Sequence, residues 1–211
     1  MILKVVVVGP YQENTYIVGS DETHEAALID AGAQWQSIMK AVEDAGLRVK
    51  MILATHGHED HVGAVADMVE ATGAIFSIHE KDAYMLERNP DSTSVIPDFR
   101  SPPEPDQYLK EGDAIEIGDL SFQVIETHGH TPGGISFYGH GLVFTGDTLF
   151  RGSVGRADFE GGDWEQLMTS IKTKLLTLPD DTVVLPGHGP QSTIGAERQW
   201  NPFVGEQGQQ Q

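Results

Sequence analysis

The residues most able to do chemistry lie in one short stretch, Thr55-His-Gly-His-Glu-Asp-His-Val-Gly63. Within it, four side chains of metal-binding types fall within six residues: His56, His58, Asp60 and His61. Side chains alternate along an extended chain, so His56 and His58 can point the same way. Asp60 and His61 offer a second direction at the start of a predicted helix. Two pairs of ligands with two directions predict two metal ions rather than one.

A buried strand and an amphipathic helix are expected on either side of this stretch. The apolar run Lys50-Met-Ile-Leu-Ala54 is bounded by turn residues and predicts a strand. A helix over residues 60–72 is predicted from four apolar residues at helical spacing: Val62, Val65, Ala66 and Val69. The four candidate ligands are therefore expected in a strand-to-helix loop that is anchored at both ends.

Three further candidate ligands follow predicted strands: His130 after 120–126, Asp147 after 142–145 and His188 after 182–185. Each stands beside glycine, which lets the backbone turn sharply. Strand ends that converge on one edge of a layered sheet are a usual place for a functional site. Taken singly, each residue could be a turn or cap residue. Together, seven nitrogen and oxygen ligands at four strand ends predict a metal centre.

The ligand types limit the chemistry of this centre. The chain contains no cysteine, which excludes disulfides, thiolate ligands and a cysteine nucleophile. Imidazole and carboxylate ligands suit Zn²⁺, with Fe or Mn as alternatives. A water bound to zinc ionises at about pH 7, and a water that bridges two ions should be at least as acidic. The expected cofactors are therefore two divalent ions that activate a hydroxide nucleophile, with Asp60 also expected to steer its proton.

The charge balance excludes some partners. The 211 residues include 32 acidic and 13 basic ones, a formal charge of −19. Nucleic-acid binding is not expected, because it needs clustered Lys and Arg. The acidic surface fits both a self-repelling soluble protein and adaptation to high salt. No stretch has the apolar length of a membrane span, and the apolar run at residues 1–8 lacks a basic leader. We therefore expect no membrane partner and a cytoplasmic protein.

The remaining pattern predicts short strands interrupted by helices. Besides those named above, strands are expected at 3–8, 16–19, 26–29, 74–78, 114–117 and 135–138. Helices are expected from Trp35 to a stop at Gly46, over 81–88, and after Asp163, where Gln166 completes a capping box. The proline-rich segment 89–106 is expected to be an irregular surface excursion. We expect a single domain over 1–204 and a flexible polar tail over 205–211.

The combined motifs resemble those of the metallo-β-lactamase superfamily: His56-x-His58-x-Asp60-His61, then His130, Asp147 and His188. The resemblance implies an α/β fold, a four-layer αβ/βα sandwich with a dinuclear site at one edge. By position in the motifs, His56, His58 and His130 would bind one ion. Asp60, His61 and His188 would bind the other, and Asp147 would bridge the two.

Within the superfamily, the run from Gly146 to Arg156 and the segments 187–190 and 201–203 are most similar to short glyoxalase II-like hydrolases. This resemblance implies hydrolysis of a small-molecule thioester, S-2-hydroxyacylglutathione, such as S-lactoylglutathione. It places Arg156 where a basic residue contacts the glutathione part. His128 stands where proline is common in the motif and is a second candidate for substrate binding.

Other functions stay open at this point. The run Gly-Arg-Ala-Asp-Phe159 also resembles a loop of the persulfide dioxygenases, which would use one Fe(II) at His56, His130 and Asp147. A lactonase or a β-lactamase is possible by fold alone, because a fold does not determine a function. The sequence leaves the acyl group, the thiol, the native metal and the oligomeric state open.

Overall fold

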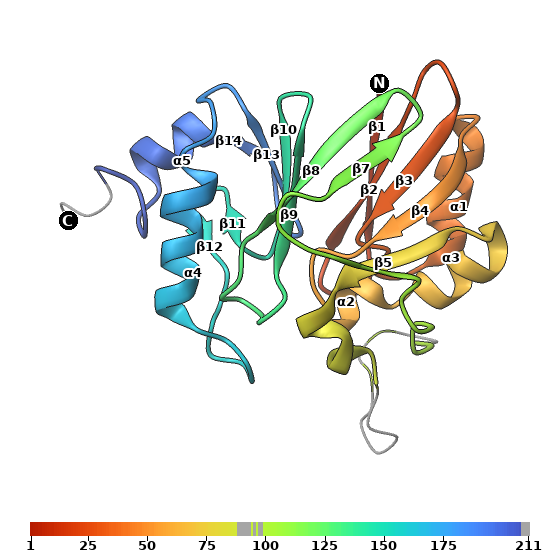
Figure 1. Cartoon of the computed structure of the whole chain (residues 1–211), viewed down its shortest axis with the longest axis horizontal. Helices are drawn as coiled ribbons and strands as arrows, with labels where there is room; N and C mark the ends of the chain where they lie inside the picture. The colour runs from red at the N-terminus through yellow and green to blue at the C-terminus, as the bar shows by residue number, and fades with distance from the viewer. Residues whose placement is uncertain (88–93, 95, 97–98, 208–211) are drawn as a thin grey trace.

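Two sheets pack face to face in the computed structural model of the chain, which describes residues 1–87, 94, 96 and 99–207 (Figure 1). The first sheet contains, in spatial order, β1 (Ile2–Val8), β2 (Glu13–Gly19), β3 (Glu25–Ile29), β4 (Arg48–Leu53), β5 (Ile75–His79) and β6 (Gln107–Leu109). The second contains, in spatial order, β14 (Ser192–Thr193), β13 (Val183–Pro186), β10 (Leu142–Gly146), β9 (Ile135–Gly139), β8 (Leu120–Glu126) and β7 (Ala114–Ile117). A small hairpin is formed by β11 (Leu149–Phe150) and β12 (Ser153–Val154).

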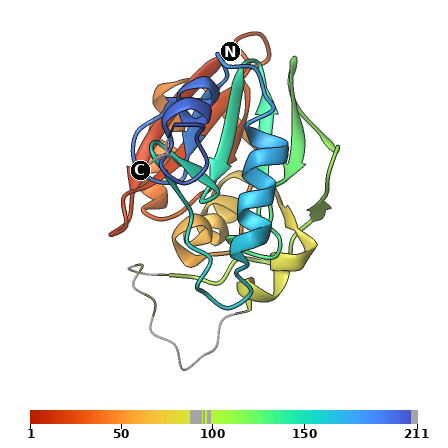
Figure 2. The same ribbon diagram turned by 90° about the vertical axis from the view of Figure 1, so that its left-hand side faces the viewer.

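Helices cover the outer face of each sheet. The helices are α1 (Trp35–Asp44), α2 (Glu59–Val62), α3 (Val65–Thr72), the 3-10 helix η1 (Glu80–Leu86), α4 (Trp164–Ser170), the π-helical turn η2 (Ile171–Leu175) and α5 (Ile194–Trp200). α1 and α3 lie on the outside of the first sheet, and α4 and α5 lie on the outside of the second (Figures 1 and 2). These layers confirm the predicted four-layer αβ/βα sandwich.

Three hydrophobic cores separate the four layers. In β2, Ile17 packs in the core between the first sheet and its helices, whereas Tyr16 and Val18 face the core between the sheets. This division follows from the alternation of side chains along a strand. Phe137 belongs to the same central core, and Val143 packs in the third core beneath α4, η2 and α5. Both sheets are therefore apolar on both faces.

Strand direction decides where the site lies. β10 runs parallel to β13, and β8 runs in the same direction as β10 because both are antiparallel to β9. In the first sheet, β3, β4, β5 and β6 are parallel neighbours. The loops that follow β8, β10 and β13 therefore leave the second sheet at a common edge.

The predicted helix over residues 60–72 is wrong as a single element. The chain forms α2 and α3 instead, separated by Gly63 and Ala64. The amide of Ala64 donates to the carbonyl of Ala31 at 2.9 Å, so it does not extend the α2 ladder. This contact from a distant segment turns the chain and lets Val65 and Met68 reach the core. Periodicity alone could not reveal the break.

The structure also differs from the prediction in the type of one helix, in several short elements and in one helix cap. The predicted helix 81–88 is the 3-10 helix η1, and its last residue lies outside the described ones. The pattern missed β6, β11, β12, β14 and α5. Asp163 does cap α4 by accepting from the Gln166 amide at 3.0 Å, while the Gln166 side chain turns to Ser170 instead of completing the box.

The proline-rich segment and the predicted tail are only partly described. Residues 99–106 are irregular, and most of 89–98 lies outside the described residues. Amides of Gly205, Glu206 and Gln207 donate to carbonyls of α5 and of Asn201, which follows it. The last four residues lie outside the described part, so the single domain and its flexible tail stay predictions. None of the helices in the described ranges is long and apolar enough to cross a membrane.

Candidate metal centre

Loops at one edge of the sandwich bring the seven predicted ligands together. Their positions are His56 and His58 after β4, Asp60 and His61 in α2, His130 after β8, Asp147 after β10, and His188 after β13. Five of the seven line a pocket of about 660 Å³: His58, Asp60, His130, Asp147 and His188. His56 and His61 lie behind them and are almost fully buried.

Three imidazoles, His56, His58 and His130, form a three-histidine cluster. His58 Nδ1 lies 3.0 Å from His56 Nε2 and 3.0 Å from His130 Nε2. The other nitrogen of each outer ring is already engaged: His56 Nδ1 faces Thr55 Oγ1 at 3.0 Å, and His130 Nδ1 faces the Arg156 carbonyl at 2.6 Å. A neutral imidazole has one N–H, so both Nε2 atoms present lone pairs toward His58. Converging lone pairs of this kind suit a metal ion.

A mixed cluster is formed by Asp60, His61 and His188. His188 Nε2 lies 3.2 Å from Asp60 Oδ2 and 3.3 Å from His61 Nε2. Again the far nitrogens face acceptors: His61 Nδ1 lies 3.0 Å from Asp30 Oδ2, and His188 Nδ1 lies 3.1 Å from the Tyr11 carbonyl. Such outer acceptors orient the ring of a metal-binding histidine.

Asp147 lies between the two clusters. Its Oδ1 is 3.3 Å from His61 Nε2 and 3.6 Å from His188 Nε2, while its Oδ2 is 3.7 Å from His130 Nε2. Oδ1 is buried and receives no hydrogen bond from the residues that the structure describes. A buried carboxylate oxygen without a partner costs free energy. A cation beside Asp147 would remove that cost.

The electrostatics at His56 and His58, in the three-histidine cluster, favour neutral rings. Burial and the neighbouring His130 lower the pKa of His58 to about 4. Burial and the adjacent imidazoles also hold the pKa of His56 well below its ordinary value. At neutral pH these rings therefore keep the lone pairs that a metal needs.

The mixed cluster has the opposite balance. Burial lowers the pKa of His61, but Asp147 and Asp30 outweigh burial and hold that pKa well above its ordinary value. Burial raises the pKa of Asp147, but His61, His188 and His130 outweigh it and keep the carboxylate ionised. A proton on His61 thus balances the negative charge of the neighbouring carboxylates. A bound divalent ion would balance the same charge.

The residues present therefore fit two divalent ions. Ligand atoms lie within 4.8 Å of one another in the three-histidine cluster, in the mixed cluster, and in a third group of His56, His61 and Asp147 that joins them. No thiolate is available, and the donors are imidazole and carboxylate, as zinc, iron and manganese accept. The ligand roles of the seven residues stay predictions.

The sequence analysis missed Asp30, the carboxylate behind both clusters. Its Oδ1 accepts from the Thr55 amide at 2.7 Å, and its Oδ2 accepts from the Thr55 hydroxyl at 2.8 Å and faces His61. Asp30 directly follows β3 and precedes a glycine-containing turn. The same local signal identified Asp147, so Asp30 could have been found in the sequence.

Aromatic side chains and one arginine form the wall of the pocket. Tyr11, Phe150 and Phe159 line it together with Arg156. The Arg156 guanidinium donates through Nε and Nη2 to Asp158, at 2.9 Å each, and lies 4.4 Å from the centre of the Phe159 ring. The predicted substrate residue Arg156 therefore lines the pocket. Its Nε and Nη2 donors are already used by Asp158.

His128, the second predicted substrate residue, is not brought to this pocket. Its Nδ1 lies 3.1 Å from the Gly134 carbonyl, and its Nε2 lies 3.2 Å from Glu126 Oε2. The ring packs edge-on against His79, with ring centres 4.9 Å apart. These contacts fix the loop that carries His130. The His128 ring turns toward β8 and β5, and His128 is not among the described residues that line the pocket.

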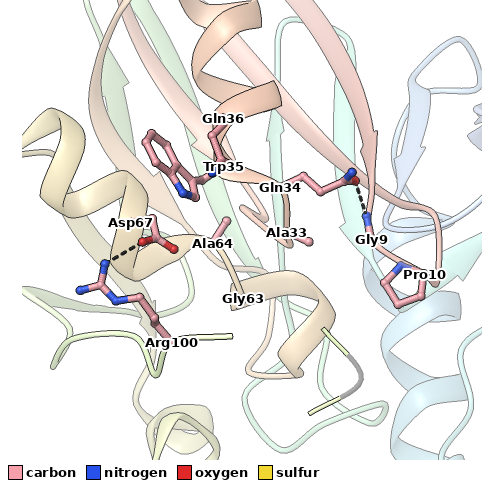
Figure 3. Close-up of a pocket in the computed structure, with 10 residues that line it drawn as sticks. All are labelled: Gly9, Pro10, Ala33, Gln34, Trp35, Gln36, Gly63, Ala64, Asp67 and Arg100. Carbon is pink, nitrogen blue, oxygen red and sulfur yellow. Dashed lines mark hydrogen bonds and ion pairs between the residues drawn. The ribbon is translucent and has the colours of Figure 1, made fainter. Parts of the chain in front are cut away.

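A second pocket, of about 440 Å³, lies between the start of α1, the turn before α3 and Arg100 (Figure 3). Three of its polar side chains are already partnered: Gln34 accepts from the Gly9 amide at 3.0 Å, and Arg100 pairs with Asp67 at 2.6 Å. None of the ligand clusters among the described residues lines it. The chemistry therefore belongs to the pocket at the metal-binding clusters.

A four-layer sandwich with clustered histidines and aspartates at one edge defines a metal-dependent hydrolase. The chain belongs to the metallo-β-lactamase superfamily, whose family model matches residues 8–188. Among its relatives is a hydroxyacylglutathione hydrolase, GloC, from Haemophilus influenzae, 37% identical over 97% of this chain and 98% of that protein. The probable metallo-hydrolase YqgX of Bacillus subtilis is 36% identical over 93% of this chain and 94% of that protein.

Solved structures show the same architecture. The B3 metallo-β-lactamase BLEG-1 superposes with a TM-score of 0.89 at 35% identity, covering 96% of this chain and 99% of that one. The protein TTHA1623, crystallised in a di-iron-bound form, superposes with a TM-score of 0.83 at 39% identity, covering 95% of this chain and 100% of that one. ETHE1 from Myxococcus xanthus has a TM-score of 0.80 at 31% identity, covering 97% of this chain and 84% of that one.

Proposed function

We propose that this chain hydrolyses the thioester of S-2-hydroxyacylglutathione at a centre of two divalent metal ions. The observation that carries the proposal is the convergence of seven imidazole and carboxylate side chains at one pocket, which five of them line while His56 and His61 lie behind. The likeness to the hydroxyacylglutathione hydrolase GloC along almost the whole chain supports the substrate class.

Each cluster has a proposed role. The three-histidine cluster would hold one ion, the mixed cluster would hold the other, and Asp147 would be shared between them. When bound, the ions would supply Lewis-acid activation of a water nucleophile and of the thioester carbonyl. Zinc is proposed, with iron or manganese as alternatives, and iron is the metal named for TTHA1623. Asp60, which lines the pocket, is proposed to hold the proton of the attacking water.

The pocket wall suits a substrate with an apolar thioester arm. Tyr11, with 56% of its surface exposed, and Phe159, with 43%, stand at the rim where a substrate would enter. Phe159 packs edge-on against His58, with ring centres 5.4 Å apart. An acyl group on this wall would lie directly beside the three-histidine cluster, with Arg156 within reach of the thiol part.

The direct test is hydrolysis of S-lactoylglutathione by purified protein, with and without a chelator. Metal-dependent release of glutathione supports the proposal. A protein with two bound ions that leaves S-lactoylglutathione and simpler lactoyl thioesters intact would contradict it.

A second candidate function is hydrolysis of β-lactams, favoured by the likeness to BLEG-1. The same protein should be assayed with a chromogenic β-lactam at equal metal loading. Faster turnover of the β-lactam than of S-lactoylglutathione would replace the first proposal with this one. Persulfide-dependent oxygen uptake, with a single iron per chain, would instead support the dioxygenase alternative.

Replacing Asp158 with asparagine is expected to strengthen binding of the anionic glutathione arm. Asp158 neutralises Arg156 at the pocket wall, and D158N would leave the guanidinium free to meet a substrate carboxylate. Both side chains are about two-thirds exposed, and exposed pairs are weak, so KM for S-lactoylglutathione should fall by about two- to fivefold. Steady-state kinetics would measure this change.

An uncharged lactoyl thioester of N-acetylcysteamine is the matched control substrate. Its KM should not change in D158N, because it has no carboxylate for Arg156 to meet. Equal changes for both substrates would show that the variant acts on the pocket shape and not on charge.

A further inference from the structure

The three-histidine cluster is built from two loops of different sheets. His56 and His58 come from the loop between β4 and α2, and His130 comes from the loop between β8 and β9. Neither loop is regular, so the relative position of the three imidazoles depends on whatever joins these loops. Ligand geometry must be held to a fraction of an ångström for tight metal binding.

The carboxylate of Asp82, in η1, joins the two loops. Its Oδ2 accepts from the Gly57 amide at 3.1 Å and from the Thr131 hydroxyl at 2.7 Å. Its Oδ1 accepts from the Gly133 amide at 2.6 Å. Gly57 separates His56 from His58, and Thr131 directly follows His130. One side chain therefore contacts residues adjacent to all three ligands.

The approach of Asp82 to both loops leaves no room for larger residues. A Cβ added to Gly133 would lie 2.7 Å from the Asp82 carboxylate carbon. A Cβ added to Gly57 would lie 3.0 Å from the Asp82 carbonyl oxygen. Glycine at Gly133 leaves room for the carboxylate, and glycine at Gly57 leaves room for the η1 backbone and Met85.

Asp82 is held there at an electrostatic cost. Its side chain is fully buried, and among the described residues no lysine or arginine forms an ion pair with it. Burial raises the pKa of Asp82, while the hydrogen bonds from Thr131, Gly133 and Gly57 oppose that rise. A buried carboxylate is tolerated when donors surround it, and here every donor comes from a ligand loop.

The start of η1 is tied to the same region by a separate contact. His79, which caps η1, accepts from the Lys81 amide at 3.1 Å through Nδ1. Its Nε2 is therefore the protonated nitrogen, and it lies 3.3 Å from Glu126 Oε1. Glu126 in turn faces His128. These contacts fix η1 against β8, so that Asp82 has a rigid support.

The mixed cluster depends on other groups. His61 is oriented by Asp30, and His188 by the carbonyl of Tyr11. Asp82 has no hydrogen bond to either of these histidines or to Asp60. The hydrogen bonds of Asp82 thus go to the loops of the three-histidine cluster, whereas Asp30 contacts His61 directly and reaches His56 through Thr55.

We propose that Asp82 is the positioning residue of the three-histidine cluster, and that it sets metal affinity there without setting the affinity of the mixed cluster. The inference rests on the proposed two-metal centre. Residues that orient ligands change metal affinity by about 10- to 100-fold when they are removed. Asp82→Ala should weaken one of the two metal sites by this factor and leave the other unchanged.

The experiment is a zinc titration of the whole chain against a competing chelator dye. The wild type should bind two ions per chain, and D82A should bind one ion as tightly as the wild type and the other about 10- to 100-fold more weakly. Anomalous diffraction from crystals of D82A at limiting zinc should locate the retained ion at Asp60, His61 and His188. Thr131→Val, which removes one of the three donors, should weaken the same site by a smaller factor.

Glu197→Gln is the matched control. Glu197 is also a buried carboxylate with three donors, which are the Gly152 amide, the Ser192 hydroxyl and the Asn201 amide, but it contacts neither loop of the three-histidine cluster. The E197Q variant should lose thermal stability without losing either ion. Equal loss of both ions in D82A, or wild-type affinity at both sites in D82A and T131V, would overturn the role of Asp82. A wild-type chain that binds no ion would overturn the proposed metal centre itself.

Discussion

Asp147→Ala is expected to lose both metal ions and hydrolytic activity together. Among the seven predicted ligands, Asp147 is the carboxylate that faces both clusters, with Oδ1 toward His61 and His188 and Oδ2 toward His130. Without it, Asp60 would be the one carboxylate left among the predicted ligands, so the repulsion between two divalent ions would be balanced less well. Loss of metal activation removes several kcal/mol of transition-state stabilisation, so kcat/KM should fall on the order of a thousandfold or more. Elemental analysis and the thioester assay would measure both effects.

The control for this variant is Asp113→Ala. Asp113 accepts from the Lys110 amide at 2.9 Å in a turn remote from the pocket, so its loss should leave metal content and activity unchanged. Normal metal content in D147A would contradict the bridging role. Loss of only one ion would assign Asp147 to a single cluster.

Removal of the metal ions is expected to abolish activity and to lower the melting temperature. Bound ions stabilise only the folded chain, because the seven side chains come from loops that unfolding separates. A ligand at a thousandfold excess over its Kd contributes about 4 kcal/mol. For a chain of this size, one such site corresponds to a fall in Tm of roughly 8–16 °C when it is emptied. Differential scanning calorimetry before and after chelation would measure the shift.

Restoration is the control for the chelation experiment. Adding Zn²⁺ after the chelator is removed should recover both Tm and activity, whereas Mg²⁺, which prefers oxygen ligands, should recover neither. An apoprotein with the Tm of the metal-loaded protein would contradict coupling between the centre and the fold. Full activity without metal would contradict the proposed chemistry.

The sequence by itself determined the set of candidate ligands and the class of fold. The seven residues were found because each is a metal-binding type that follows an apolar strand, and five of them stand beside glycine, so the signal is local. The family motifs then implied the four-layer sandwich, which is confirmed. The convergence of His130, Asp147 and His188 on one edge follows from strand direction, because β8, β10 and β13 all run the same way. The other four candidate ligands follow β4 of the first sheet, and the packing of the two sheets brings them to the same edge.

Only the tertiary structure decided how these ligands are held. Asp82 meets Gly57 and Gly133 across 25 and 51 residues, and no local pattern links such positions. The break between α2 and α3 likewise depends on a hydrogen bond from Ala64 to Ala31. The pairing of Arg156 with Asp158 depends on how the loop after β12 folds, and the turn of His128 toward Glu126 depends on its packing against β5 and β8. Side-chain types can be found from the sequence, but their supports depend on which distant segments the packed cores bring into contact.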